Sequence, residues 1–179
     1  MTLSIVALSG SLRKKSTHTR LLQEVGYLAG PDVSFVLFDG LEDLPAFNPD
    51  RNSSTSPQAE KWIALVRHAD VLMVSSPEYA HGIPGALKNA LDWLVGEDAF
   101  IEKPFCLYRA CPRPVFAPAA LMEVLRTMSG RHVAGADVTI NLRRDYDIAG
   151  DVLATEESRA LIQDSIAQLI NDIKARERT

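Results

Sequence analysis

Short apolar runs alternate with amphipathic segments along most of this 179-residue chain. The run Asp70–Ser76 is apolar at successive positions, as is typical of a strand buried on both faces of a parallel sheet. Periodicity predicts strands at Leu3–Leu8, Val33–Asp39, Asp70–Ser76 and Lys103–Tyr108, with a fifth inside His132–Leu142. It predicts helices at Thr17–Ala29, Ala59–His68, Ile83–Val95, Ala119–Met128 and Glu156–Ala175.

Five strands that alternate with five helices predict an α/β fold with a parallel sheet covered on both faces. The common doubly wound order for five strands is the flavodoxin-like one. We therefore expect a flavodoxin-like, three-layer fold in a single domain over residues 1–179. The polar segment Pro45–Gln58 is interpreted as a rim over a site and not as a domain boundary.

Charge and composition exclude several classes of partner. The net charge of -4 gives no reason to expect nucleic acid or an anionic membrane. No apolar run approaches the ~20 residues of a membrane span, and the amino end is interpreted as a strand. Cys106 and Cys111 are expected to be free thiols in a reducing cytoplasm, and no metal site is expected.

The segment "GSLRKKST", Gly10–Thr17, follows the first predicted strand and precedes the first predicted helix. Ligands of open parallel sheets bind at the carboxyl ends of the strands, and a helix amino end attracts phosphate. Ser11, Ser16 and Thr17 offer hydroxyls, and the planar fork of Arg13 can grip two phosphate oxygens. The segment therefore predicts a phosphate-binding loop.

A purely structural interpretation of this segment remains open at this point. Ser16 or Thr17 could only cap the helix, and the cations could form a solvated turn, with Lys14 and Lys15 facing solvent. The chain has neither the P-loop nor the G-x-G-x-x-G pattern, and no cysteine lies in the loop. The phosphate is thus expected to be one end of a larger ligand that lies across the strand ends.

A second segment, "SPEYAHGIPGALKNALDW", follows the third predicted strand. Together with "GSLRKKS" it resembles the NADPH-dependent FMN reductase family, the flavodoxin-like group that includes quinone, chromate and azo-dye reductases. "LPAFNPD" and "KPF" also resemble that family's segments, and the resemblance covers about the first two thirds of the chain. It implies FMN as cofactor and NADPH or NADH as co-substrate.

The resemblance also implies roles for individual residues. Ser11, Arg13 and Ser16 would hold the FMN phosphate, with Thr17 and His18 beside it, and Pro77, Glu78 and Tyr79 would line the flavin ring. The helix that carries Lys88, Asn89 and Asp92 would pack against a second subunit in a homodimer or homotetramer. No acid–base side chain is needed for hydride transfer, so no catalytic residue is assigned. Arg109, Arg113 and His81 are candidates to meet the NADPH phosphates.

The chain departs from the family pattern at three places. His18 and Ala80 each stand where the family usually has Asn. After the fourth predicted strand, the family's Ser- and Gly-rich loop is replaced by "RACPRPVFAPAA", Arg109–Ala120, which has three prolines and no glycine. Prolines have no N–H to donate to a ligand. The flavin could therefore be held differently, or the pocket could be reshaped.

These observations favour an FMN-dependent NAD(P)H oxidoreductase that reduces quinones, flavin or other small acceptors by two-electron, ping-pong hydride transfer. One alternative is a flavodoxin-like scaffold that has weakened or lost FMN binding and acts as an interaction protein. Another is a one-electron carrier of the flavodoxin type, although such carriers are usually more acidic than this chain.

Overall fold

The computed structural model describes residues 2–51, 54, 56–142 and 155–176. Its sheet has the strand order β2-β1-β3-β4-β5, with β6 also paired to β4, and every pairing between these strands is parallel. The strands are β1 Leu3–Ser9, β2 Val33–Phe38, β3 Val71–Ser75, β4 Pro104–Arg109, β5 Arg131–His132 and β6 Val138–Thr139. The predicted doubly wound, flavodoxin-like α/β fold is confirmed.

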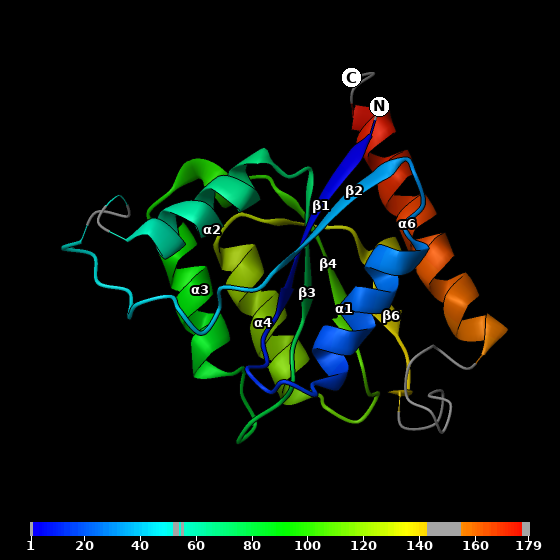
Figure 1. Ribbon diagram of the computed structural model, residues 1–179, viewed down its shortest axis with the longest axis horizontal. Helices are drawn as coiled ribbons and strands as arrows, with labels where there is room; N and C mark the ends of the chain where they lie inside the picture. The colour runs from blue at the N-terminus through cyan, green and yellow to red at the C-terminus, as the bar shows by residue number, and fades with distance from the viewer. Residues whose placement is uncertain (1, 52–53, 55, 143–154, 177–179) are drawn as a thin grey trace.

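The helices cover the sheet in two layers (Figure 1). They are α1 Thr17–Leu28, α2 Pro57–His68, α3 Gly85–Val95, α4 Phe116–Thr127 and α6 Glu156–Arg176. One core lies between the sheet and α2, α3 and α4, and the other lies between the sheet and α1 and α6. None of the described helices is both long enough and apolar enough to cross a membrane.

The fifth strand expected inside His132–Leu142 is divided in the structure. The structure has two short strands, β5 and β6, separated by a 3-10 turn at Ala134–Ala136. Asp137 bridges this interruption, because its Oδ1 accepts a 2.8 Å hydrogen bond from the N–H of Leu107 in β4. Its Oδ2 lies 2.8 Å from Nε2 of His132. A side chain thus replaces the backbone acceptor that an uninterrupted strand would supply.

Three predicted helix starts also differ from the structure. Ser56 caps α2 by accepting the N–H of Ala59, so Pro57 is the first helical residue. Pro84 is the N-cap residue of α3 and not its first helical residue, and Ile83 lies outside the helix. The predicted start of α4 at Ala119 was wrong by one turn, since the helix begins at Phe116. Pro118 is tolerated there because the first-turn N–H groups have no intrahelical partner.

Asn89 and Trp93, one turn apart on α3, hold the long loop that follows β2. The Asn89 side chain accepts from the N–H of Phe47 at 2.7 Å and donates to the carbonyl of Pro45 at 2.9 Å. Trp93 Nε1 donates to the same carbonyl at 2.9 Å, and its ring packs edge-on against Phe47. These contacts give Asn89 a structural role within the subunit.

The hydrogen bond accepted by Asp137 predicts that a substitution at this position lowers stability most when it removes the acceptor oxygen. Asp137→Ala leaves the N–H of Leu107 without this acceptor, so the free energy of unfolding should fall by about 1–3 kcal/mol. Asp137→Asn keeps an oxygen at the same place and should lower the free energy of unfolding by clearly less. Urea unfolding of the three proteins measures the difference. Equal losses in both variants would contradict the role given to the hydrogen bond.

Candidate functional site

The loops after β1, β3 and β4 meet at the carboxyl edge of the sheet, which lies at the lower edge of Figure 1. They enclose a cavity of about 450 Å³, within the usual range of cofactor sites. Its lining residues come from all three loops: Ser11, Arg13, Lys15, Ser16, Thr17, His18, Pro77, Tyr79, Ala110, Cys111, Arg113 and Pro114. All the predicted cofactor-binding residues except Glu78 are therefore brought together in one cavity.

The first loop leaves β1 in close contact with α3. The N–H of Gly10 donates to the carbonyl of Ser75 at 2.8 Å, and a Cβ added to Gly10 would lie 2.9 Å from Cδ2 of Leu87. A larger residue would push the loop away from α3. The absence of a side chain therefore lets the backbone pass directly into the ligand-facing turn.

Ser16 begins α1 and lines the cavity at the same time. Its Oγ accepts from the N–H of His18 at 3.2 Å and from that of Thr19 at 3.4 Å, so the capping interpretation is confirmed. The hydroxyl hydrogen of a capping serine remains available to a ligand. Thr17, the exposed first residue of the helix, lies beside it at the positive end of the helix dipole. Capping and phosphate binding are thus compatible here.

The cavity is lined by cations on two sides. Arg13 and Lys15 come from the first loop and Arg113 comes from the loop after β4, whereas no Asp or Glu is among the described residues that line the cavity. Lys15 is exposed as expected, but it also lines the cavity, and Lys14 does not. A concave surface that carries charge of one sign concentrates ligands of the opposite sign. The electrostatics therefore favour a ligand with phosphate groups.

His18 is buried beneath the first loop. Its Nδ1 lies 2.9 Å from Oγ of Ser75, the last residue of β3. Burial lowers the pKa of His18 from 6.5 to about 4, so the imidazole is neutral at pH 7. A neutral ring contributes a hydrogen bond at most and adds no positive charge to the phosphate loop.

The loop after β3 contains a tight hairpin turn between Tyr79 and Gly82. The N–H of each residue donates to the carbonyl of the other, at 3.0 Å and 2.9 Å. Ala80 and His81 between them have φ values of 48° and 59°, the left-handed values of a type I′ turn. The turn fixes Tyr79, which lines the cavity and is 51% exposed.

The remaining charged candidates lie at different places around the cavity. The Glu78 side chain reaches the start of α4, where its carboxylate accepts two backbone hydrogen bonds. Arg109 donates to carbonyls of its own loop and so is held within the protein. Arg113 lines the cavity, and the ring of His81 stacks on Phe116 outside the lining. Arg113 is therefore the candidate best placed to meet a second phosphate-bearing ligand.

Sequence reasoning missed Ala110, Cys111 and Pro114 as lining residues. The rule that all carboxyl-end loops meet at one edge could have identified them, since they follow β4 directly. Within the described part of the chain, the N–H groups of Cys111 and Arg113 have no hydrogen-bond partner. Non-proline residues in this loop can therefore supply donors to a flavin edge even though the prolines cannot.

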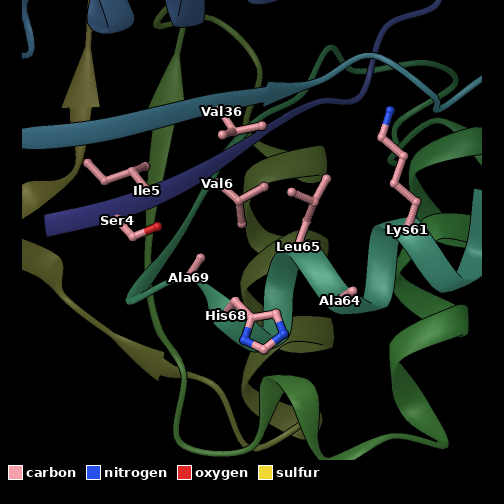
Figure 2. A pocket seen from close by; sticks show the side chains of 9 residues that line it. All are labelled: Ser4, Ile5, Val6, Val36, Lys61, Ala64, Leu65, His68 and Ala69. Carbon is pink, nitrogen blue, oxygen red and sulfur yellow. The ribbon is translucent and has the colours of Figure 1, made fainter.

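A second hollow lies between α2 and the strands β1 and β2, away from this edge (Figure 2). Figure 2 shows Val6, Val36 and Leu65 directed into it, while Lys61 extends from α2 at its border. The lining is mostly aliphatic, and it offers no group of polar side chains that converge on one point. Of these two hollows, the cavity at the carboxyl edge is therefore the one whose described lining has the chemistry of a cofactor site.

The left-handed conformation of Ala80 predicts that the chain can be stabilised at this position. Such a conformation costs an ordinary L-residue about 1–2 kcal/mol, whereas Asn adopts it readily. Ala80→Asn should therefore raise the free energy of unfolding by about 0.5–1 kcal/mol. Ala80 is exposed, so repacking does not complicate the comparison. Ala80→Val, a β-branched control, should shift the denaturation midpoint in the opposite direction.

The lowered pKa of His18 predicts a loss of stability in acid. Between pH 6.5 and about 4 the unfolded chain binds a proton on His18 that the folded protein does not bind, so folding weakens as the pH falls. The full shift corresponds to about 3 kcal/mol. His18→Asn should remove the part of the pH dependence of the free energy of unfolding that arises from His18. Urea unfolding at pH 7 and pH 4.5 measures it, and identical pH profiles for both proteins would contradict the burial of a neutral ring.

Comparisons with known proteins agree with this geometry. The chain is 30% identical to an NAD(P)H-dependent FMN reductase of Pseudomonas aeruginosa over 173 residues, which is 93% of each protein. It is 38% identical to a probable NADPH:quinone oxidoreductase of Oryza sativa over 95 residues, 51% of this chain and 47% of that protein. A 2-hydroxy-1,4-benzoquinone reductase of Burkholderia is 38% identical over 93 residues, half of its length.

Solved structures show the same fold. The flavoenzyme NAD(P)H:(acceptor) oxidoreductase of Paracoccus denitrificans superposes with a TM-score of 0.81 at 22% identity, covering 95% of this chain and 98% of the other. A flavodoxin-like domain from Synechococcus has a TM-score of 0.58 at 15% identity, covering 96% and 99%. The model of the family described as NADPH-dependent FMN reductase matches residues 3–158. The expected cofactor, FMN, and the nicotinamide co-substrate are thereby confirmed, and this oxidoreductase chain belongs to the NADPH-dependent FMN reductase family.

Proposed function

We propose that this chain is an NAD(P)H-dependent quinone reductase that works through FMN bound in the cavity at the carboxyl edge. The cavity itself carries the proposal, because a helix amino end, three hydroxyls and three cations converge there, and none of the lining residues that the structure describes is a carboxylate. FMN, when bound, supplies the chemistry of accepting and returning a hydride. The chain's own residues bind it, orient it and leave one side open to the second substrate.

The first loop would hold the phosphate end of FMN. Ser11, Ser16 and Thr17 would donate hydroxyl hydrogen bonds, and Arg13 would add a charge-assisted contact. His18 would support this loop from beneath as a neutral ring. Pro77 and Tyr79 would line the flavin ring, and the amides of Cys111 and Arg113 would face its polar edge. No side chain is assigned an acid–base step.

A single cavity for two successive substrates supports ping-pong turnover. The nicotinamide co-substrate would bind with its phosphates at Arg113 and would leave before the acceptor enters. The acceptor would be a quinone, free flavin or a similar small molecule. We further propose that residues 1–179 act as one FMN-binding domain in a cytoplasmic homodimer or homotetramer that uses α3 as a contact surface. The scaffold alternative predicts a chain of the same fold that binds no FMN.

Binding of FMN predicts a rise in melting temperature. At a free FMN concentration of about 100 times Kd the native state gains about 2.7 kcal/mol. For a chain of this size, that should raise Tm by about 5–10 °C. Riboflavin, which lacks the phosphate, should give a smaller shift. A protein that remains colourless with an unchanged Tm would leave the scaffold alternative standing.

With FMN bound, initial rates measured at several concentrations of NADPH and a quinone should give parallel double-reciprocal lines.

Arg13 is the residue that tests the phosphate loop. Arg13→Ala removes a hydrogen bond to a charged group, so FMN binding should weaken by about 1.5–3 kcal/mol, or roughly 10- to 150-fold in Kd. The matched control is Lys14→Ala, since Lys14 lies in the same loop and does not line the cavity. Fluorescence titration of the flavin gives both constants. Equal Kd values for the two variants would show that Arg13 is only a solvated turn residue.

A further inference from the structure

Helix α4 begins without a cap from its own neighbourhood. Its N-cap residue, Val115, makes no side-chain capping bond. Instead, Oε2 of Glu78, from the loop after β3, accepts from the N–H of Phe116 at 2.8 Å and from that of Ala117 at 2.8 Å. The carboxylate also lies where the helix dipole favours a negative charge. The loop after β3 therefore fixes where α4 begins.

Arg109, the last residue of β4, ties down the segment between that strand and α4. Its Nη2 donates to the carbonyl of Pro112 at 3.1 Å and to that of Pro114 at 2.9 Å. Because both proline carbonyls bond to the same guanidinium, the backbone between them is held in one conformation. The fixed φ angles of the two prolines restrict it further. Residues 110–115, here called the proline wall, are thus anchored at one end by Arg109 and at the other by Glu78.

The proline wall forms one side of the cavity through Ala110, Cys111, Arg113 and Pro114. Neither anchoring residue lies in the lining itself. Phe116, directly after the wall, also stacks on His81 with ring centroids 4.2 Å apart, which joins the same two loops a second time. The shape of this side of the cavity therefore depends on contacts made outside it.

We propose that Glu78 and Arg109 are positioning residues that hold the proline wall in its ligand-ready form, an inference that rests on the FMN function proposed above. A glycine-rich loop can adjust its backbone to a flavin, whereas a proline-rich one must already have the right shape. When an anchor is removed, part of the population has a displaced wall. The apparent Kd for FMN then rises in inverse proportion to the fraction of molecules whose wall is still in place.

The test compares two probes, FMN and inorganic phosphate, on the full-length protein. Glu78→Leu removes the acceptor at nearly constant size, and Glu78→Gln keeps an acceptor oxygen but removes the charge. Arg109→Met removes the other anchor. Glu123→Leu and Arg126→Met are matched controls, because both residues are exposed on α4 itself. Phosphate binding is measured by its competition with FMN.

Loss of a helix cap corresponds to about a 2- to 30-fold change in an equilibrium, which sets the upper limit of the rise in FMN Kd expected for Glu78→Leu. Glu78→Gln should show a smaller rise, and the controls none. Phosphate affinity should stay unchanged, because the first loop is intact. The effects of Glu78→Leu and Arg109→Met on the FMN Kd should not simply multiply, since both variants displace the same wall.

Two results would overturn the inference while the proposed function stands. One is an unchanged FMN Kd in Glu78→Leu. The other is an equal weakening of FMN and phosphate binding together with a lower Tm of the FMN-free protein, which marks a general loss of structure. A wild-type protein that binds no FMN would instead overturn the proposed function first.

Discussion

The reversal of strand order between β1 and β3 is the constraint on which the site depends. The chain adds β2 on one side of β1 and then crosses to add β3 and β4 on the other side. Because all these strands are parallel, the loops after β1, β3 and β4 open at the same edge. The side chains in these loops lie far apart in sequence, yet the topology alone makes them neighbours.

The topology brings the loops together, and specific contacts then make them rigid. Gly10 lets the first loop pass close to Leu87, and Ser16 fixes the start of α1. The hairpin turn at Ala80 holds Tyr79, although two left-handed residues carry conformational strain there. These contacts and the left-handed turn thus lie at the edge where a ligand would bind, and none of the residues that make them lines the aliphatic hollow beside α2.

Most of the fold was predictable because periodicity reports directly on burial. The first four strands and the helix positions follow from local patterns of apolar residues. The divided fifth strand and the early start of α4 were not predictable in this way. Both involve a carboxylate whose bonding partner is distant in sequence: Asp137, between β5 and β6, accepts from the N–H of Leu107, and Glu78 accepts from the first N–H groups of α4. Local sequence contains no signal for a partner 30 or 38 residues away.

The residues of the site can likewise be divided into those that local sequence predicts and those that it does not. Ser11, Arg13 and Ser16 could be predicted because hydroxyls and a cation between a strand and a helix have a local meaning. The neutral state of His18 could not, because it follows from burial against Ser75 on another strand. Glu78 lies between Pro77 and Tyr79, which line the cavity, and local sequence does not indicate that its carboxylate bonds the start of α4.

The central claim is that FMN binds across the carboxyl edge with its phosphate in the loop that opens α1. A crystal structure of the protein with FMN tests this most directly. The account predicts phosphate oxygens within hydrogen-bond distance of Ser11, Arg13 and Ser16, with the flavin ring between Tyr79 and residues 110–115. A flavin bound in the hollow beside α2, or a phosphate turned away from Arg13 into solvent, would contradict it.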